Sequence, residues 1–284
     1  MRVFLANPPW VEKDKHEGYG VRAGSRWPHF EDSISSYFPF PFFLAYAAAV
    51  LEEAGYAVRL RDSIAEKDSV KDFLNELASF QPDLLLIETS TPSIESDLEL
   101  CRTVSARRPG LKIALAGPHS EMYSADFLAA HPELFAILPG EYELTALELA
   151  KALGEGRIPD SVAGLIFRQG ESIVRTPARP LIEHLDDLPF PARHLLNMNR
   201  YQDLFCELPS PGLQIISSRG CPFQCIFCSW PQVMYGSHRY RARSAANILD
   251  EIESCLRRYK YRSIYFDDDT FNIGEKRILE ICDE

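Results

Sequence analysis

The chain has 284 residues, of which 46% are hydrophobic and 25% are charged, a composition that excludes a disordered protein and leaves room for two domains. Its formal net charge of −11 argues against general nucleic-acid binding, which depends on neutralising phosphates. No apolar run approaches the roughly 20 residues that cross a bilayer, and the first residues lack the pattern of a signal peptide. We therefore expect a cytoplasmic protein that does not bind membranes.

The first 150 residues alternate between apolar segments typical of strands and longer segments typical of helices. Strands are expected at residues 2–7, 57–62, 82–90, 111–117 and 135–140, and helical segments at residues 41–56, 69–80, 94–107, 124–132 and 142–153. The run "LLLI" at residues 84–87 is apolar throughout, as parallel strands buried on both faces are. This alternation predicts a doubly wound parallel sheet of the Rossmann-like, α/β class.

Ligands of such sheets bind outside the carboxyl ends of the strands. The loops expected there are rich in glycine, proline and hydroxyl residues, which let a large ligand approach the backbone. The candidate binding residues in them are Asn7, Pro8, Thr89, Ser90, Gly117, His119, Gly140 and Glu141. Many βα loops without a ligand share this composition, so the pattern alone leaves ligand binding open.

The sequence changes character after the last of these helices. Residues 154–212 contain a hairpin signal around Gln169 and Gly170, followed by a proline-punctuated stretch that we interpret as a connector. A second alternation begins at residue 213, with strands at residues 213–217 and 262–269 and helices at residues 244–260 and 275–284. The sequence thus predicts a first domain at residues 1–153, a hairpin and connector at 154–212, and the start of a second domain at 213–284.

Three cysteines follow the first strand of the second domain as C-x3-C-x2-C: Cys221, Cys225 and Cys228. Three thiolates on one short loop can converge on a single soft metal centre. A disulfide would leave the third cysteine unpaired and is disfavoured in a reducing compartment. Zinc usually takes four ligands, so a zinc site with His238 as the fourth stays open. The other cysteines, Cys101, Cys206, Cys255 and Cys282, are expected to act as small buried hydrophobes.

The stretch "CPFQCIFC" after a strand resembles the signature of the radical S-adenosylmethionine (SAM) superfamily. In that family three thiolates hold a [4Fe–4S] cluster whose fourth iron binds SAM, and the reduced cluster cleaves SAM to a 5′-deoxyadenosyl radical. The resemblance implies that Cys221, Cys225 and Cys228 are the cluster ligands. It also implies SAM contacts for Phe227, Asp268, Asp269 and Arg243. Core packing is the alternative role for Phe227, and helix capping is the alternative for the aspartates.

The rest of the chain resembles the cobalamin-dependent members of that superfamily. "NPP" after the first strand, "GPH" after the fourth, and the later "LDDLPFP" and "DDDTF" carry this resemblance. It implies that the loop residues of the first domain contact cobalamin, and that residues 213–284 begin a partial (β/α) barrel. "DKHEG" at residues 14–18 is one residue shorter than the D-x-H-x-x-G motif that ligates cobalt. The resemblance therefore implies that His16 does not bind cobalt, and that His119 contacts the corrin or hydrogen-bonds within its loop.

The resemblance predicts a radical SAM enzyme with cobalamin as second cofactor. Either methyl transfer to an unactivated carbon or a cyclisation is expected, on a small-molecule or natural-product substrate, with a flavodoxin- or ferredoxin-type reductant. The alternatives are a radical SAM protein without cobalamin and a non-catalytic cobalamin- or zinc-binding module. Because residues 213–284 have room for only the beginning of a barrel, we expect a C-terminally truncated chain with weak turnover.

Overall fold

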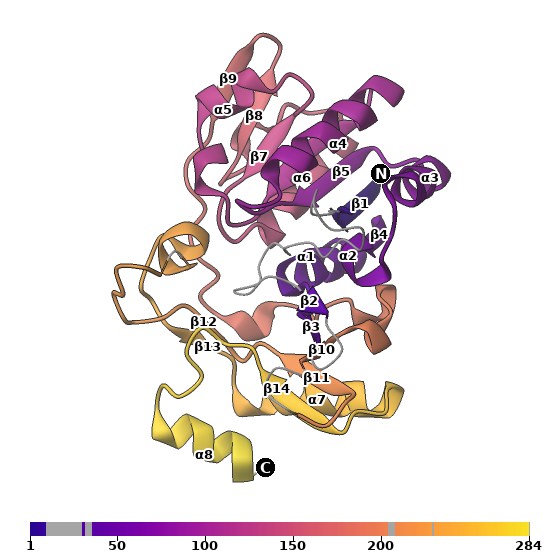
Figure 1. The fold of residues 1–284 in the computed structure, drawn as a ribbon. Coiled ribbons are helices and arrows are strands. Elements are labelled where there is room, and N and C mark those ends of the chain that lie inside the picture. The colour runs from indigo at the N-terminus through magenta and orange to yellow at the C-terminus, as the bar shows by residue number, and fades with distance from the viewer. Residues whose placement is uncertain (10–29, 32–35, 204–207, 229, 284) are drawn as a thin grey trace.

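The computed structural model describes residues 1–9, 30–31, 36–203, 208–228 and 230–283. They form a larger α/β part at the N-terminal side and a smaller part at the C-terminal side, which meet near helix α1 (Phe42–Glu53) (Figure 1). Among the described residues, no helix is long and apolar enough to cross a membrane.

The larger part is built on a seven-stranded sheet in the order β4-β1-β5-β6-β7-β8-β9. Its parallel strands are β1 (Arg2–Asn7), β4 (Ala57–Asp62), β5 (Leu84–Glu88), β6 (Lys112–Ala116) and β7 (Ala136–Leu138). The chain passes from β1 to β4 on one side and returns to place β5 on the other side of β1. The carboxyl ends of β1 and β5 are therefore the topological switch point, where open α/β sheets bind ligands.

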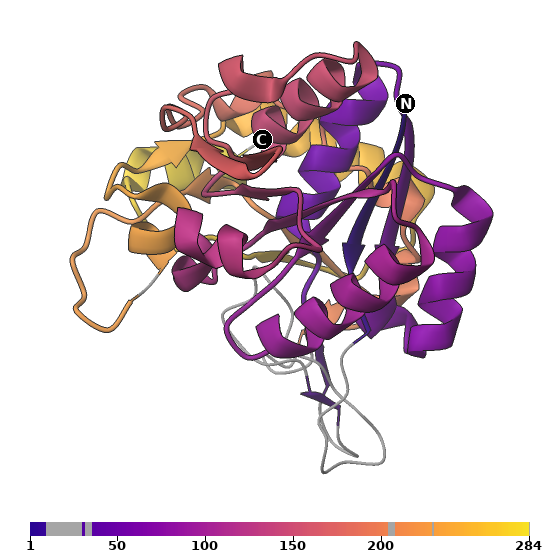
Figure 2. The same ribbon diagram turned by 90° about the horizontal axis from the view of Figure 1, so that it is seen from above.

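Helices cover both faces of this sheet (Figure 2). They are α1, α2 (Ser63–Glu66), α3 (Val70–Phe80), α4 (Ile94–Arg107), α5 (Ala125–Ala130) and α6 (Glu143–Gly154). Alternate residues of a strand point to opposite faces, so Val3 and Leu5 pack in the core with α1 and α6, whereas Phe4 packs with α3 and α4. The predicted doubly wound sheet is confirmed.

The hairpin that we grouped with the connector belongs instead to this sheet. Strands β8 (Ile166–Gln169) and β9 (Ser172–Arg175) form it, and β8 pairs antiparallel with β7. The hairpin covers β7, which would otherwise be an exposed edge strand. Only the stretch after β9 runs between the two parts, mostly as short 3-10 turns, namely Leu185–Asp187, Arg193–Leu195 and Met198–Arg200.

The smaller part begins with a strand–helix–strand unit. Strands β11 (Gly212–Ile215) and β14 (Ser263–Phe266) pair in parallel, and α7 (Ala245–Arg258) packs on them through Ile248 and Ile252. Strands β12 (Ser218–Arg219) and β13 (Arg241–Ala242) pair antiparallel. A π-helical turn (Pro231–Tyr235) follows the cysteines, and α8 (Glu275–Asp283) comes last. A further small sheet has the order β10 (Gln202–Asp203), β3 (Ser36–Phe38) and β2 (Phe30–Glu31).

Candidate functional site

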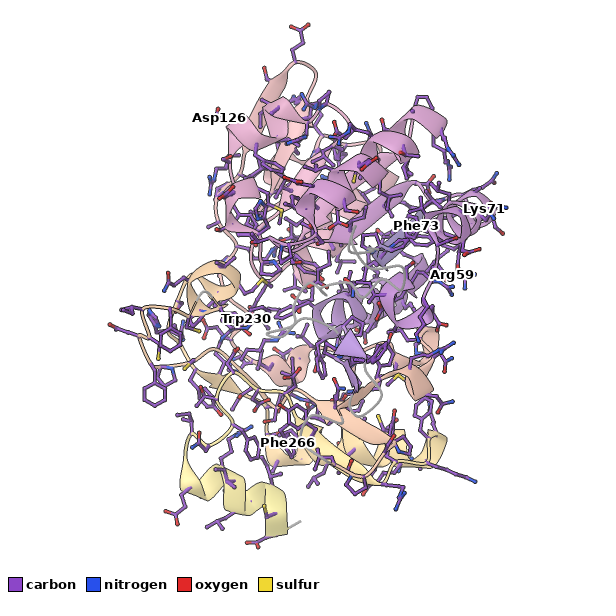
Figure 3. The ribbon with its side chains drawn as sticks, in the orientation of Figure 1. Arg59, Lys71, Phe73, Asp126, Trp230 and Phe266 are labelled. Atoms are coloured by element: carbon purple, nitrogen blue, oxygen red, sulfur yellow. The ribbon has the colours of Figure 1, made fainter. Side chains whose placement is uncertain are left out.

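The structure gathers the predicted loop residues at one edge of the large sheet. Asn7 ends β1, Thr89 and Ser90 follow β5, Gly117 and His119 follow β6, and Gly140 and Glu141 follow β7. Because these strands are parallel, their carboxyl ends lie at the same edge. The loop that carries Cys221, Cys225 and Cys228, here called the cysteine loop, projects away from this edge (Figure 2), whereas the side chain of Trp230, which follows it, lies at the junction of the two parts (Figure 3). There its ring centroid lies 6.1 Å from that of Phe43 in α1.

Asn7 is the residue of this edge that most clearly lacks a partner. Its side chain is 1% exposed, and neither its amide nitrogen nor its amide oxygen has a hydrogen-bond partner among the described residues. A buried amide without partners costs free energy. Its position at the switch point between β1 and β5 fits a ligand that supplies the missing hydrogen bonds.

Gly117 allows the loops after β5 and β6 to touch. Its φ is +109°, and a Cβ at this position would lie 2.2 Å from the carbonyl oxygen of Thr89. Two side-chain contacts also hold these loops, one within the loop after β6 and one between the two loops. The Tyr123 hydroxyl donates to the Gly117 carbonyl at 2.6 Å, and His119 Nδ1 lies 3.1 Å from the Thr91 hydroxyl. Burial lowers the pKa of His119.

Beneath these loops lies an acid that the sequence analysis missed. Asp97, on α4, accepts hydrogen bonds from the hydroxyls of Thr89 at 2.6 Å and Ser93 at 2.8 Å. Burial raises the pKa of Asp97 to about 7. The hydroxyl-rich run "TSTPS" followed by an acid in the first turn of a helix was the signal available in the sequence. Asp97 fixes the backbone that carries Thr89 and Ser90.

The cysteine loop is open to solvent. Cys225 is exposed, Cys221 and Cys228 are half-buried, and all three are free of disulfides. Phe227 is 88% exposed, so the alternative that it packs in the core is wrong. Among the other cysteines, Cys101 and Cys255 are buried as expected, and Cys282 is exposed, contrary to expectation. Cys206 and residues 14–18 lie outside the described residues.

The three thiols do not yet surround one point. Among the described residues, no group of three or more His, Cys, Asp or Glu side chains could hold a metal ion. His238, the fourth ligand of the zinc alternative, is instead hydrogen-bonded through Nδ1 to the Phe223 carbonyl at 3.0 Å. Three free thiols within one loop still have the donor chemistry of an iron–sulfur site. Loading a cluster requires the loop to close around it.

The aspartates after β14 hold the start of the cysteine loop in place. Asp268 is buried and accepts hydrogen bonds from the backbone N–H groups of Ser217 at 2.6 Å and Ser218 at 3.2 Å, and from both serine hydroxyls. Asp269 accepts from the N–H of Gly220 at 3.0 Å. The helix-capping alternative is wrong, because α8 begins six residues later, at Glu275. The structure gives Asp268 an anchoring role in place of the predicted SAM contact.

Arg243 also differs from its prediction. Its guanidinium is buried, contacts Glu251 at 2.5 Å, and donates to the Ile216 carbonyl at 2.9 Å. Glu251 in turn pairs with Arg193 of the connector at 2.8 Å. Buried charges require such partners. The structure therefore assigns Arg243 to the packing of α7 against the connector.

A second buried ion cluster joins the two parts of the chain, and Glu141 belongs to it. Arg219 of β12 lies 3.3 Å from Glu141 and 2.7 Å from Glu143, and Arg241 of β13 lies 2.8 Å from Glu141. All four side chains are buried. Burial acts to raise the pKa of Glu141, but Arg219 and Arg241 hold it below its ordinary value. The buried position of Glu141 is therefore explained by its pairing with Arg219 and Arg241, and not by a ligand contact.

Aromatic rings complete the environment of Arg219. Its guanidinium carbon lies 4.8 Å from the ring centroid of Phe43 and 5.1 Å from that of Tyr46, both on α1. Such cation–π contacts are strongest when they are desolvated. Arg219 stands two residues before Cys221, so these contacts fix the start of the cysteine loop against the sheet edge.

Known proteins are similar in sequence to both parts of the chain. Residues 36–150 match the B12 binding domain family. The chain is 30% identical over 241 residues to the uncharacterized methyltransferase PH0819 of Pyrococcus horikoshii, covering 85% of this chain and 51% of that protein. It is 28% identical over 290 residues to the anaerobic magnesium-protoporphyrin IX monomethyl ester cyclase of Cereibacter sphaeroides, covering 100% of this chain and 43% of the cyclase. The chain thus spans about half the length of these relatives.

A solved structure shares the fold. The radical SAM methyltransferase TsrM from Kitasatospora setae, with cobalamin and a [4Fe–4S] cluster bound, superposes with a TM-score of 0.66 at 20% identity. The match covers 99% of this chain and 50% of TsrM. It therefore includes the large sheet, the connector and the cysteine loop.

The ion cluster predicts a large stability effect. Glu141→Gln leaves two buried guanidinium groups short of one negative charge, and we expect it to lower the free energy of unfolding by about 3 to 5 kcal/mol in urea titrations. Glu183→Gln is the matched control, because Glu183 pairs with Arg239 at the surface and its loss should cost about 1 kcal/mol or less. Equal effects of the two substitutions would contradict a dominant role for the buried cluster.

The raised pKa of Asp97 predicts an unusual pH dependence of the free energy of unfolding. This pKa is about 7 in the folded chain and about 3.9 in an unfolded one. Between these values the folded chain holds a proton that the unfolded chain has released, so this group makes stability fall as pH rises. The slope approaches about 1.4 kcal/mol per pH unit.

We expect Asp97→Asn to remove this slope, because an amide does not titrate in this pH range. The fold should be kept, because the amide oxygen can still accept hydrogen bonds from Thr89 and Ser93. Urea unfolding between pH 4.5 and 7 measures the effect. Glu99→Gln, on the exposed face of the same helix, provides the baseline for removing one acid. A slope that persists in Asp97→Asn would rule out Asp97 as its source.

Proposed function

We propose that this chain cleaves SAM reductively with cobalamin as second cofactor. Residues 36–150 match the B12 binding domain family, the chain is similar to a methyltransferase and a cyclase, and it shares the fold of a radical SAM methyltransferase that binds cobalamin and a [4Fe–4S] cluster. One observation carries the proposal. A solvent-open loop with three free cysteines follows Arg219, whose buried ion pairs with Glu141 and Glu143 hold the start of that loop at the carboxyl edge of the large sheet.

We assign Cys221, Cys225 and Cys228 as the cluster ligands and Phe227 as the contact to the adenine of SAM. The exposure of Phe227 supports this, since an apolar ring in water gains by covering a ligand. Asp269 acts next to them by holding the Gly220 backbone. When bound, the cluster supplies the electron that cleaves SAM, and cobalamin supplies a methyl carrier or redox partner.

The cobalamin edge is assigned to the loops of the large sheet. Asn7 supplies unpaired hydrogen-bonding groups, and Gly117 lets the loops after β5 and β6 pack closely together. The remaining contacts are assigned to Pro8, Thr89, Ser90, His119 and Gly140. Thr89 and Ser90 are positioned through Asp97 and Ser93, so this loop needs little reorganisation on binding.

The reaction of the whole protein is methyl transfer to an unactivated carbon or a cyclisation, since the relatives include a methyltransferase and a cyclase. Its substrate is a small molecule or natural product, and a flavodoxin- or ferredoxin-type protein delivers the electron. SAM cleavage consumes one electron per event, which this reductant supplies.

Anaerobic reconstitution tests the cluster. With iron and sulfide, the chain is expected to turn brown and bind about four irons. Cys225→Ser should lose most of this iron, whereas Cys282→Ser, which alters an exposed cysteine outside the loop, should keep it. Formation of 5′-deoxyadenosine under a strong reductant measures SAM cleavage. Colourless protein with a single zinc would overturn the proposal.

Retention of hydroxocobalamin through desalting tests the second cofactor. Asn7→Ala should weaken binding by up to roughly tenfold, the value of one or two hydrogen bonds. It should leave the urea midpoint of the apo chain unchanged or raised, because it removes an unsatisfied buried group. Asn199→Ala, on a 3-10 turn of the connector, is the control. A wild-type chain that retains no cobalamin would favour a radical SAM protein without it.

A further inference from the structure

We propose that Thr270 is a positioning residue for the iron–sulfur centre, because its hydroxyl donates a hydrogen bond to the sulfur of Cys221 and raises the reduction potential of the cluster held there. The Thr270 Oγ1 to Cys221 Sγ distance is 2.9 Å. The inference rests on the proposed function, since it concerns the cluster that the three cysteines would bind.

The contact is the last in a series of hydrogen bonds between residues 267–270 and residues 215–221. The Asp267 N–H donates to the Ile215 carbonyl at 2.8 Å, where β14 leaves its pairing with β11. Asp268 then holds Ser217 and Ser218, and Asp269 holds Gly220. Thr270 follows opposite Cys221. Four consecutive residues thus contact the seven-residue stretch 215–221. The three hydrogen-bonded residues before Thr270 therefore fix its position opposite Cys221.

The backbone before Cys221 is also held from the opposite side. Gly220 has a φ of +87°, and a Cβ there would lie 2.1 Å from the carbonyl oxygen of Arg239. The chain leading into β13 therefore packs directly on Gly220, while Asp269 holds its N–H. Because the Gly220 backbone is restrained, the position of the next residue, Cys221, is restrained as well. Of the three cysteines, it is the one that the fold places before any cluster is bound.

A hydrogen bond to a ligand sulfur affects the two oxidation states unequally. Reduction adds one electron to the cluster and its thiolates, and an O–H donor stabilises the more negative state more strongly. The Thr270 hydroxyl can rotate to donate to sulfur, since a hydroxyl hydrogen has no fixed direction. The contact is partly buried, where a hydrogen bond is stronger than in water. Loss of this donor therefore makes the cluster harder to reduce.

Redox titration of the reconstituted full chain, followed by electron paramagnetic resonance, tests the inference. Thr270→Val removes the hydroxyl at nearly constant shape and should move the midpoint to a more negative potential. At the wild-type midpoint, the ratio of reduced to oxidised cluster should fall by up to about tenfold, which corresponds to about 59 mV for one electron. Thr270→Ser should restore the wild-type midpoint.

Thr103→Val is the matched control, because Thr103 donates its hydroxyl to the Glu99 carbonyl within α4. Its midpoint should equal that of the wild type. If Thr270→Val loads no cluster, Thr270→Ala is titrated in its place. If neither loads while circular dichroism shows an intact fold, recovery of loading in Thr270→Ser supports the positioning role, and no recovery overturns it.

Two negative results are distinguishable. A wild-type chain that loads four irons, together with a hydroxyl-free variant of unchanged midpoint, overturns the role of Thr270 and leaves the proposed function standing. A wild-type chain that binds no cluster after anaerobic reconstitution overturns both.

Discussion

The buried guanidinium of Arg219 is the contact on which the candidate site depends. A charge without water must find opposite charges, and Arg219 finds Glu141 and Glu143 on the loop after β7 and at the start of α6. In the β12–β13 pair it stands directly opposite Arg241, an arrangement of like charges that is unfavourable by itself. Glu141, between the two arginines, removes the repulsion. The start of the cysteine loop therefore keeps this position only while Arg219 and Arg241 pair with Glu141 of the larger part.

The fold restrains the start of the cysteine loop but not its middle. Its start is restrained by the ion cluster, by Asp268 and by Gly220, whereas Cys225 and the side chains around it face solvent. This division suits a loop that closes around a metal centre, since one fixed ligand sets the position while the others adapt. The sheet edge shows a similar division. Asp97 fixes the loop after β5, and Asn7 leaves hydrogen-bonding groups for a ligand.

Most of the fold could be predicted because its signals are local. The apolar run of β5 and the spacing of α4 depend on neighbouring residues alone, and both elements lie where they were expected. The hairpin was recognised, but its place was not, because pairing of β8 with β7 depends on which edge is left uncovered. Among the site residues, Arg243, Asp268 and Glu141 received ligand roles from the resemblance. The structure gives each of them buried protein partners instead.

The sequence by itself determined the order of the strands and helices along the chain, the loops at the carboxyl ends of the strands, and the three-thiol donor set. These depend on residue type and on spacing along the chain. Only the tertiary structure decided which charges pair, which amide stays unpaired, and that Thr270 meets Cys221 across 49 positions. Arg241 and Glu141 are 100 positions apart. No local pattern encodes such a pairing, because the energy of a buried charge depends on the groups that folding brings around it.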